Sequence, residues 1–353
     1  MYRRPLHQKK SKGAALILVL GVLAIMTVLT VQINGSAKNL TKQQFSLKQL
    51  QQSYWYARSG EEFAKLESKK YVSSKYIPED KRSIIFPIED GSIEIIITLM
   101  QDCFNLNSFS QRSAIKVNNR LINENDQNSN NNNNSNENNE KINLQGVELK
   151  RKQLNTLFNH FSINADRSTL FADRLIDWLD ADNIPTGIYG AENTYYASTQ
   201  PARLTPNQHL FSLSEIRQFL EKDYQDFTAV EDLLCTRPGD NQLRVNINQL
   251  DPSSATLISA ILIGNISDEA ALSIIENRPK AGFSSLDEFW QLAELKDINI
   301  NEAQKNAFSI ENRYFQIETK VNYLNAKFSL ISLLRINEDK SVDIISRQYG
   351  VIS

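Results

Sequence analysis

Residues 14–33 read AALILVLGVLAIMTVLTVQI, and no charged residue occurs between Gly13 and Lys38. Twenty helical residues at about 1.5 Å each span about 30 Å, the thickness of the hydrocarbon core of a bilayer. Basic residues precede this run, at Arg3, Arg4, Lys9, Lys10 and Lys12. The length and the absence of charge predict a transmembrane segment over residues 14–36. Because Lys and Arg are enriched on the cytoplasmic side of membrane helices, we expect its N-terminus in the cytoplasm and the bulk of the chain outside it.

The transmembrane segment leads directly into a second, amphipathic stretch. From Ile33 to Leu66 the chain has no proline. Apolar side chains recur there at helical spacing, at Leu40, Leu47, Leu50, Tyr54, Ala57 and Phe63. We therefore predict one helix from Ala14 to Leu66, about 80 Å long. A cleaved signal peptide, with an apolar region of about 7–15 residues, is less compatible with this extension. An ordinary anchor followed by a core helix remains an alternative.

Two separated groups of β-rich segments follow. Within residues 82–100, isoleucine-rich runs flank Glu89-Asp90-Gly91, which predicts a hairpin. Pro87 places the first of these strands at a sheet edge, and the poor alternation of the second suggests burial on both faces. Three more β-rich runs occur at residues 314–321, 326–336 and 341–348.

The long segment between these groups changes to helical periodicity, with Ser or Asp residues placed as helix N-caps. Sheet halves separated in this way must meet in space. We predict an α+β fold: a long N-terminal helix, an antiparallel sheet and a large inserted α-helical domain. The predicted parts are a basic leader (1–13), the membrane part of the helix (14–36), the helix and first strands (37–107), a disordered Asn-rich loop (108–143), the inserted domain (144–310) and the last strands (311–353). A division of the inserted domain into two sub-bundles near 235–248 is an alternative to a single bundle.

The two cysteines, Cys103 and Cys235, are far apart in the sequence. Thiols outside the cytoplasm meet oxidising conditions, so we predict a disulfide between them, with two free buried cysteines as the alternative. A zinc or thioredoxin-like site is not indicated, because the sequence has no CxxC motif.

An acidic motif marks the end of one predicted helix. Residues 177–182 read DWLDAD. The carboxylates of Asp177, Asp180 and Asp182 are repelled there by the partial negative charge of the helix C-terminus and by one another. A hard cation such as calcium, which takes 6–8 oxygen ligands, would relieve this repulsion. A solvated acidic helix end is the alternative.

Nucleic-acid binding and catalysis are disfavoured. Residues 271–289 look like a helix-hairpin-helix, but residues 251–310 carry nine acidic and four basic side chains, whereas phosphate binding requires a surplus of cations. The only histidines are His7, His160 and His209, and the sequence has no GxSxG, P-loop or HExxH motif. We therefore expect no enzymatic activity.

The junction KSKG-AALILVLGVLAIMTVLTV resembles the leader of type IV pilin-like proteins. That resemblance implies cleavage by a prepilin peptidase between Gly13 and Ala14, methylation of the new N-terminus, and retention of the apolar helix. Most of that class has Glu at the fifth mature position, where this chain has Leu18. Lack of this glutamate is typical of the K-type minor pseudopilins of type II secretion.

Further segments resemble the same K-type family: FNLN (104–107), DWLDAD, GAENTYY (190–196), FSLSEIRQFL (211–220) and LRVNINQL (243–250). The inserted domain would then be SAM-like or helix-hairpin-helix-like. Some family members bind calcium there, which implies a ligand pool of Asp177, Asp180, Asp182, Glu192 and Asn193. Glu215 is a weaker candidate, since Glu is favoured at any helix N-terminus.

The resemblance also implies a place and partners. The chain would be anchored in the bacterial inner membrane by one span, with its bulk in the periplasm. It would start pseudopilus assembly at the tip with I- and J-type subunits and so support protein export, with no nucleic-acid partner. A minor pilin of a type IV pilus or DNA-uptake system is one alternative, and an anchored periplasmic domain with no filament role is another.

Overall fold

The computed structural model describes residues 14–73, 83–110 and 133–350, and only the backbone of residues 14–15 and 133–144. The basic leader before Ala14, including the expected cleavage residue Gly13, lies outside the described residues. Most of the Asn-rich segment, residues 111–132, does so as well.

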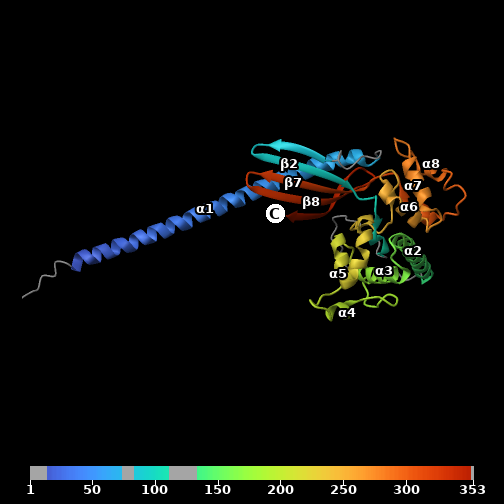
Figure 1. The fold of residues 1–353 in the computed structure, drawn as a ribbon, viewed down its shortest axis with the longest axis horizontal. Coiled ribbons are helices and arrows are strands. Elements are labelled where there is room, and N and C mark those ends of the chain that lie inside the picture. The colour runs from blue at the N-terminus through green and yellow to red at the C-terminus, as the bar shows by residue number, and fades with distance from the viewer. Residues whose placement is uncertain (1–13, 74–82, 111–132, 351–353) are drawn as a thin grey trace, which may run out of the picture.

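Helix α1 runs without interruption from Ala14 to Ser68, which confirms the predicted single helix. Its N-terminal half projects from the body of the molecule (Figure 1). Within the described residues this is the one helix long and apolar enough to cross a membrane. Every large apolar side chain from Leu16 to Ile33 is at least 47 % exposed, so protein contacts do not account for this apolar surface. A short 3₁₀ turn, Lys69–Tyr71, ends the helix.

The strands that the structure describes form a five-stranded antiparallel sheet in the order β1-β2-β7-β8-β9. The predicted hairpin forms β1 (Ser83–Ile88) and β2 (Gly91–Leu99), with Pro87 on the edge strand as expected. The predicted C-terminal runs form β7 (Tyr314–Tyr323), β8 (Ala326–Ile336) and β9 (Val342–Gly350). Ile97 of β2 pairs with Ile317 of β7, so the two groups of strands do meet across the insertion.

The C-terminal half of α1 covers one face of this sheet. Ala57 and Ala64 pack among Ile93, Ile95 and Ile97 of β2 in one buried cluster. The prediction that β2 is buried on both faces is wrong, because burial alternates strictly along it. Ile93, Ile95 and Ile97 share the face that packs against α1. Ile96 is the one isoleucine on the other face of the strand, and it interrupts the alternation in the sequence.

The described helices and short strands of the insertion lie at the end of the body remote from the projecting part of α1 (Figure 1). They are α2 (Asn133–His160), α3 (Ala165–Leu179), α4 (Asn193–Ala197), α5 (Ile216–Leu220), α6 (Thr256–Ile261), α7 (Asp268–Glu276), α8 (Leu286–Trp290) and α9 (Glu302–Lys305), with the strand pairs β3 (Phe104–Asn105) with β4 (Leu234–Cys235) and β5 (Val245–Asn246) with β6 (Phe308–Ser309). Within the described part of the insertion, four 3₁₀ segments join them: Leu106–Phe109, Leu213–Glu215, Glu221–Leu233 and Pro252–Ser254.

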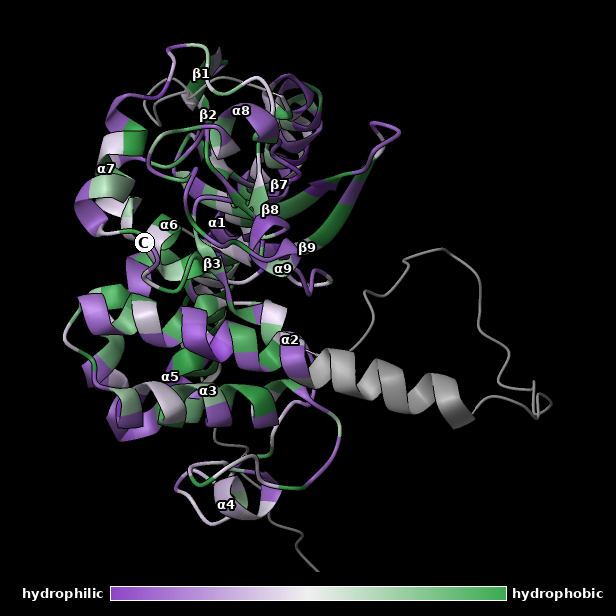
Figure 2. Cartoon of the chain, turned by 90° about the vertical axis from the view of Figure 1, so that its right-hand side faces the viewer, coloured by the Kyte–Doolittle hydropathy of each residue, from purple (hydrophilic) through white to green (hydrophobic). Residues whose placement is uncertain are grey.

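Helix α2 packs against both α3 and α6, and Figure 2 shows hydrophobic and hydrophilic residues alternating along α2 and α3, as expected for helices with one buried face. One hydrophobic cluster extends through the whole insertion, from Phe104 to Phe308.

The insertion begins earlier than predicted. Phe104 pairs with Leu234 of β4, and Phe104 and Leu106 are fully buried in the core of the helical domain. The FNLN segment therefore belongs to the insertion and not to the sheet domain. Helix α2 likewise begins at Asn133, inside the segment expected to be disordered. Once the apolar part of α2 is packed, adding turns at its N-terminal end costs no new nucleation.

A buried junction holds the insertion to the sheet. Cys103 and Cys235 form a disulfide with 5.8 Å between their Cα atoms, in agreement with the predicted pairing. Arg237 is fully buried and donates to the Met100 carbonyl at the end of β2. Its guanidinium lies over the ring of Tyr314, the first residue of β7, and pairs with Asp240 at 2.8 Å. Arg237 thus contacts the chain both where it leaves the sheet after β2 and where it returns to the sheet at β7.

Candidate functional site

Three carboxylates from two segments converge at the C-terminal end of α3. Asp177 is fully buried in its last turn, Asp180 is its C-cap residue, and Glu192 immediately precedes α4. One carboxylate oxygen of each lies within 4.8 Å of the others. The spacing of three between Asp177 and Asp180 places both on one helix face, while residues 181–191 bring Glu192 back toward them.

Backbone groups hold this returning loop in place. The Thr186 amide donates to Asp177 Oδ1 at 2.9 Å, and the Tyr189 amide donates to Asp173 Oδ2 at 3.2 Å. Arg151 of α2 pairs with Asp173 at 2.7 Å. A Cβ added to Gly190 would lie 2.4 Å from the Thr186 nitrogen and 2.6 Å from Asp177 Oδ2, so the loop can approach this closely only with glycine there.

The site brings several carboxylates together, two of them on buried side chains. Glu192 is only 2 % exposed, and neither of its carboxylate oxygens has a hydrogen-bond partner among the described residues. Burial, followed by the charges of Asp177, Asp180 and Asp182, raises the pKa of Glu192 to about 7. Burial also raises the pKa of Asp177, against hydrogen bonds from Thr186 and Ala191 that lower it.

These donors fit a hard divalent cation. Burying a carboxylate without a hydrogen-bond partner, as with Glu192, is costly. One carboxylate oxygen of each of the three residues is within reach of a single ion. Oxygen donors in an irregular loop are the ligands that calcium prefers.

The remaining predicted ligands are engaged in other contacts. Asp182 accepts a hydrogen bond from the Ile184 amide at 2.8 Å and is exposed. Asn193 Oδ1 accepts from the amide and the hydroxyl of Thr205, and its Nδ2 donates to Asn183. Asn193 therefore ties two loops together. Glu215 completes the capping box at Ser212 and accepts from Trp178 Nε1, which gives it a structural role.

Sequence reasoning missed Asp173 and Arg151. Asp173 lies one helical turn before Asp177 on the same face, and the i,i+4 spacing could have indicated it. Its partner Arg151 is on another helix, and no local pattern connects the two.

Comparison with known proteins gives consistent matches. Two family models, both described as type II secretion system protein K, match residues 102–239 and 245–311, together more than half of the chain. The type II secretion system protein K of Pectobacterium carotovorum subsp. carotovorum is 25 % identical over 97 % of this chain and 98 % of its own length. That of Dickeya chrysanthemi is 27 % identical, again over 97 % of this chain and 98 % of its own length.

A solved structure has the same fold. It is a chain of the GspK-GspI-GspJ complex from the type 2 secretion system of enterotoxigenic Escherichia coli. The TM-score is 0.66 at 21 % sequence identity, and the match covers 86 % of this chain and 98 % of that one.

Proposed function

This chain belongs to the type II secretion system protein K family, and from that premise we propose that it is the minor pseudopilin at the pseudopilus tip. There it starts assembly with the I- and J-type subunits and so supports protein export across the outer membrane. The role is one of assembly, with no catalytic step and no nucleic-acid partner.

The position of the insertion carries the proposal of a terminal place. The helical domain lies at the end of the body away from the projecting half of α1 (Figure 1). In a filament built by packing N-terminal helices side by side, this domain would clash with a subunit stacked beyond it. Leu18, 69 % exposed on α1, stands where most pilin-like proteins have Glu. The chain therefore has no carboxylate at this position to neutralise the N-terminal amine of a neighbouring subunit.

The N-terminal segment supports a processed, retained anchor. We propose that a prepilin peptidase cuts between Gly13 and Ala14 and that the new N-terminus is methylated. Helix α1 then remains in the inner membrane as a single span, with the bulk of the chain in the periplasm. The Cys103–Cys235 disulfide suits that oxidising compartment. Mass spectrometry of the purified protein should find methylated Ala14 at the N-terminus, and an intact Met1 would contradict the filament role.

Calcium is the proposed ligand of the acidic site, held by Asp177, Asp180 and Glu192. Bound calcium would place positive charge between these carboxylates, of which Asp177 and Glu192 are buried, and so fix the loop between α3 and α4. Any protein that binds an ion only when folded is stabilised by it, by about 2.7 kcal/mol at a hundredfold excess over Kd. Calcium should raise the melting temperature of the wild type and of Asp182→Asn, but not that of Asp177→Asn.

Co-purification tests the assembly role directly. The full-length chain, tagged and solubilised in detergent, should retain I- and J-type subunits of the same secretion system when the three are co-expressed. The experiment is run with calcium and with a chelator. Complex formation that fails under both conditions would overturn the tip assignment, whereas loss with the chelator alone would connect the acidic site to assembly.

A further inference from the structure

The two edges of the sheet differ in their protection against strand addition. Strand β1 forms one edge and contains Pro87, which has no amide hydrogen to donate. Strand β9 forms the other edge, contains no proline, and pairs only with β8 among the described strands. An edge of this kind presents a row of backbone donors and acceptors to any extended chain beside it.

Only part of β9 is suited to pairing. The register with β8 shifts between Leu333, opposite Ser346, and Leu334, opposite Ile344, which places a bulge at Ile345. Bulges bend a strand and discourage pairing. Beyond the bulge the register is regular to Gly350, and the last three residues, Gln348 to Gly350, are exposed. The regular open segment is therefore Ser346 to Gly350.

An apolar patch adjoins this segment on the α1 side of the sheet. Tyr349 is 54 % exposed, and its ring centroid is 5.8 Å from that of Tyr54 on α1. Leu47 and Leu40 precede Tyr54 at intervals of seven residues, so they share its helix face. They are 65 % and 59 % exposed. Leu40, Leu47, Tyr54 and Tyr349, here called the edge stripe, lie along one line from the projecting half of α1 to the open edge.

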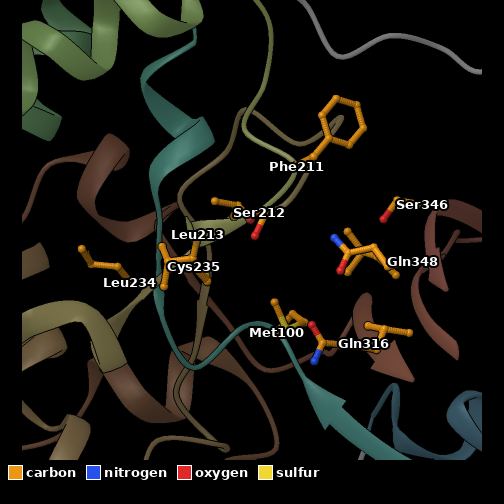
Figure 3. A pocket seen from close by; sticks show the side chains of 12 residues that line it. Met100, Phe211, Ser212, Leu213, Leu234, Cys235, Gln316, Ser346 and Gln348 are labelled. Carbon is orange, nitrogen blue, oxygen red and sulfur yellow. The ribbon is translucent and has the colours of Figure 1, made fainter. Parts of the chain in front are cut away.

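On the opposite face of the sheet, the same segment borders a cleft of about 280 Å³. Ser346 and Gln348 face Phe211 and Ser212 of the insertion across it (Figure 3). Phe211 is 48 % exposed. A strand added at β9 could therefore place alternate side chains toward the edge stripe and toward this mixed polar and apolar cleft.

We propose that residues 346–350 of β9 pair with an edge strand of a neighbouring pilin-like subunit, whose N-terminal helix lies along the edge stripe. The continuity of stripe and edge selects this partner. A loose peptide would use the edge alone, but a pilin-like subunit brings a long helix and a sheet together. The inference rests on the proposed place in the pseudopilus and specifies one contact within it.

Site-specific photocrosslinking tests the pairing. A photoreactive amino acid is placed at Gln348 in the full-length chain, co-expressed with the I- and J-type subunits. The matched control carries it at Ile85 on β1, which is 66 % exposed at the protected edge. We expect a crosslink from position 348 to an edge strand of one of these subunits, mapped by mass spectrometry, and a much weaker one from position 85.

The possible outcomes separate this inference from the proposed function. If the three proteins co-purify but position 348 crosslinks to no strand of a partner, strand pairing is wrong and the tip role stands. If no complex forms at all, both are wrong.

Binding affinity gives a second measurement. Tyr349→Ala and Leu47→Ala should each weaken the complex about tenfold, as expected for central interface side chains. Leu66→Ala serves as the control, because Leu66 is equally apolar and 66 % exposed on α1 but lies outside the edge stripe. An equal effect of all three substitutions would contradict the proposed contact. Circular dichroism of each variant checks that the fold is retained.

Discussion

Arg347 at the open edge of the sheet forms a double hydrogen bond with Glu61 of α1. Its Nε lies 2.9 Å from Glu61 Oε1 and its Nη2 lies 3.2 Å from Oε2. Glu61 is fully buried and also contacts Ser332 of β8 and Arg58. Burial alone would raise the pKa of Glu61, but the hydrogen bonds from Arg347 and Ser332 and the nearby arginine charges outweigh it and lower that pKa. One ion pair thus fastens the edge strand to the helix.

Replacing Arg347 by Met should destabilise the α1–sheet unit by about 3 kcal/mol, because it leaves a buried carboxylate with incomplete compensation. Trp55 is the one tryptophan outside the insertion. Its fluorescence during urea unfolding, in a Trp178→Phe/Trp290→Phe background, reports on this unit. Glu61→Gln combined with Arg347→Met should recover part of the loss. A cost below about 1 kcal/mol would show that the pair adds little.

The same pair predicts an acid dependence. Since the pKa of Glu61 is lower in the folded protein, its contribution to stability is present at neutral pH and is lost as the pH falls through that lowered value. The unfolding midpoint by Trp55 fluorescence should therefore decline below about pH 4.5 in the wild type. The decline should be shallower in the Glu61→Gln variant. Equal slopes in the two proteins would contradict the assignment.

A close helix–sheet contact gives a prediction about packing. A Cβ added to Gly60 of α1 would lie 2.7 Å from Thr319 Cγ2 on β7. Gly60→Ala should cost about 1–3 kcal/mol through overpacking, measured by urea unfolding. Thr319→Ser, which removes the obstructing methyl group, should restore most of this loss. Gly35→Ala is the control, because a Cβ there meets nothing within 4 Å. Failure of the rescue would indicate that helix displacement, and not this methyl contact, sets the cost.

The α1–sheet domain could be predicted because its signals are local. The uncharged run and heptad spacing define α1, and Asp90-Gly91 defines the hairpin. Asp90 has a φ of 62°, in the left-handed region that a tight turn uses. That the two groups of strands meet followed only from the requirement that an interrupted sheet closes, and the particular pairing of β2 with β7 was not predicted. The boundary at Phe104 could not be predicted, since a two-residue strand has no periodicity.

The acidic site was predictable only in part, for a similar reason. Asp177 and Asp180 share a helix face, so their proximity follows from spacing. Glu192 was predicted as a ligand only from the family resemblance. Its position beside Asp177 depends on a loop held by Thr186 and Gly190. The hydrogen bonds of Asn193 to Thr205 and Asn183 join segments whose proximity no sequence pattern reveals.

Glu192 predicts a pH dependence of stability opposite in sign to that of Glu61. Its folded pKa of about 7 exceeds the ordinary value of 4.5, so the folded state binds the proton more tightly. In the presence of a chelator, the stability of the insertion should fall as the pH rises from about 4.5 to about 7 and then level off. Glu192→Gln should flatten this slope. Melting followed by Trp178 and Trp290 fluorescence measures it, and a stability that rises over this range would contradict the raised pKa.

The disulfide gives the last prediction, about the junction. Cys103 and Cys235 are separated by 132 residues, so opening the bond frees a long loop in the unfolded chain and should cost about 2–5 kcal/mol. The effect should centre on the insertion, because Arg237 and the pairing of β3 with β4 lie beside the bond. The Cys103→Ala/Cys235→Ala variant should therefore show faster proteolysis within residues 102–311, while the sheet and α1 keep their protection. Equal loss of protection in the sheet would mean that the bond stabilises the two parts as one cooperative unit. Reduction of the wild type should reproduce the variant and leave the variant itself unchanged, which separates loss of the bond from any effect of the substitutions.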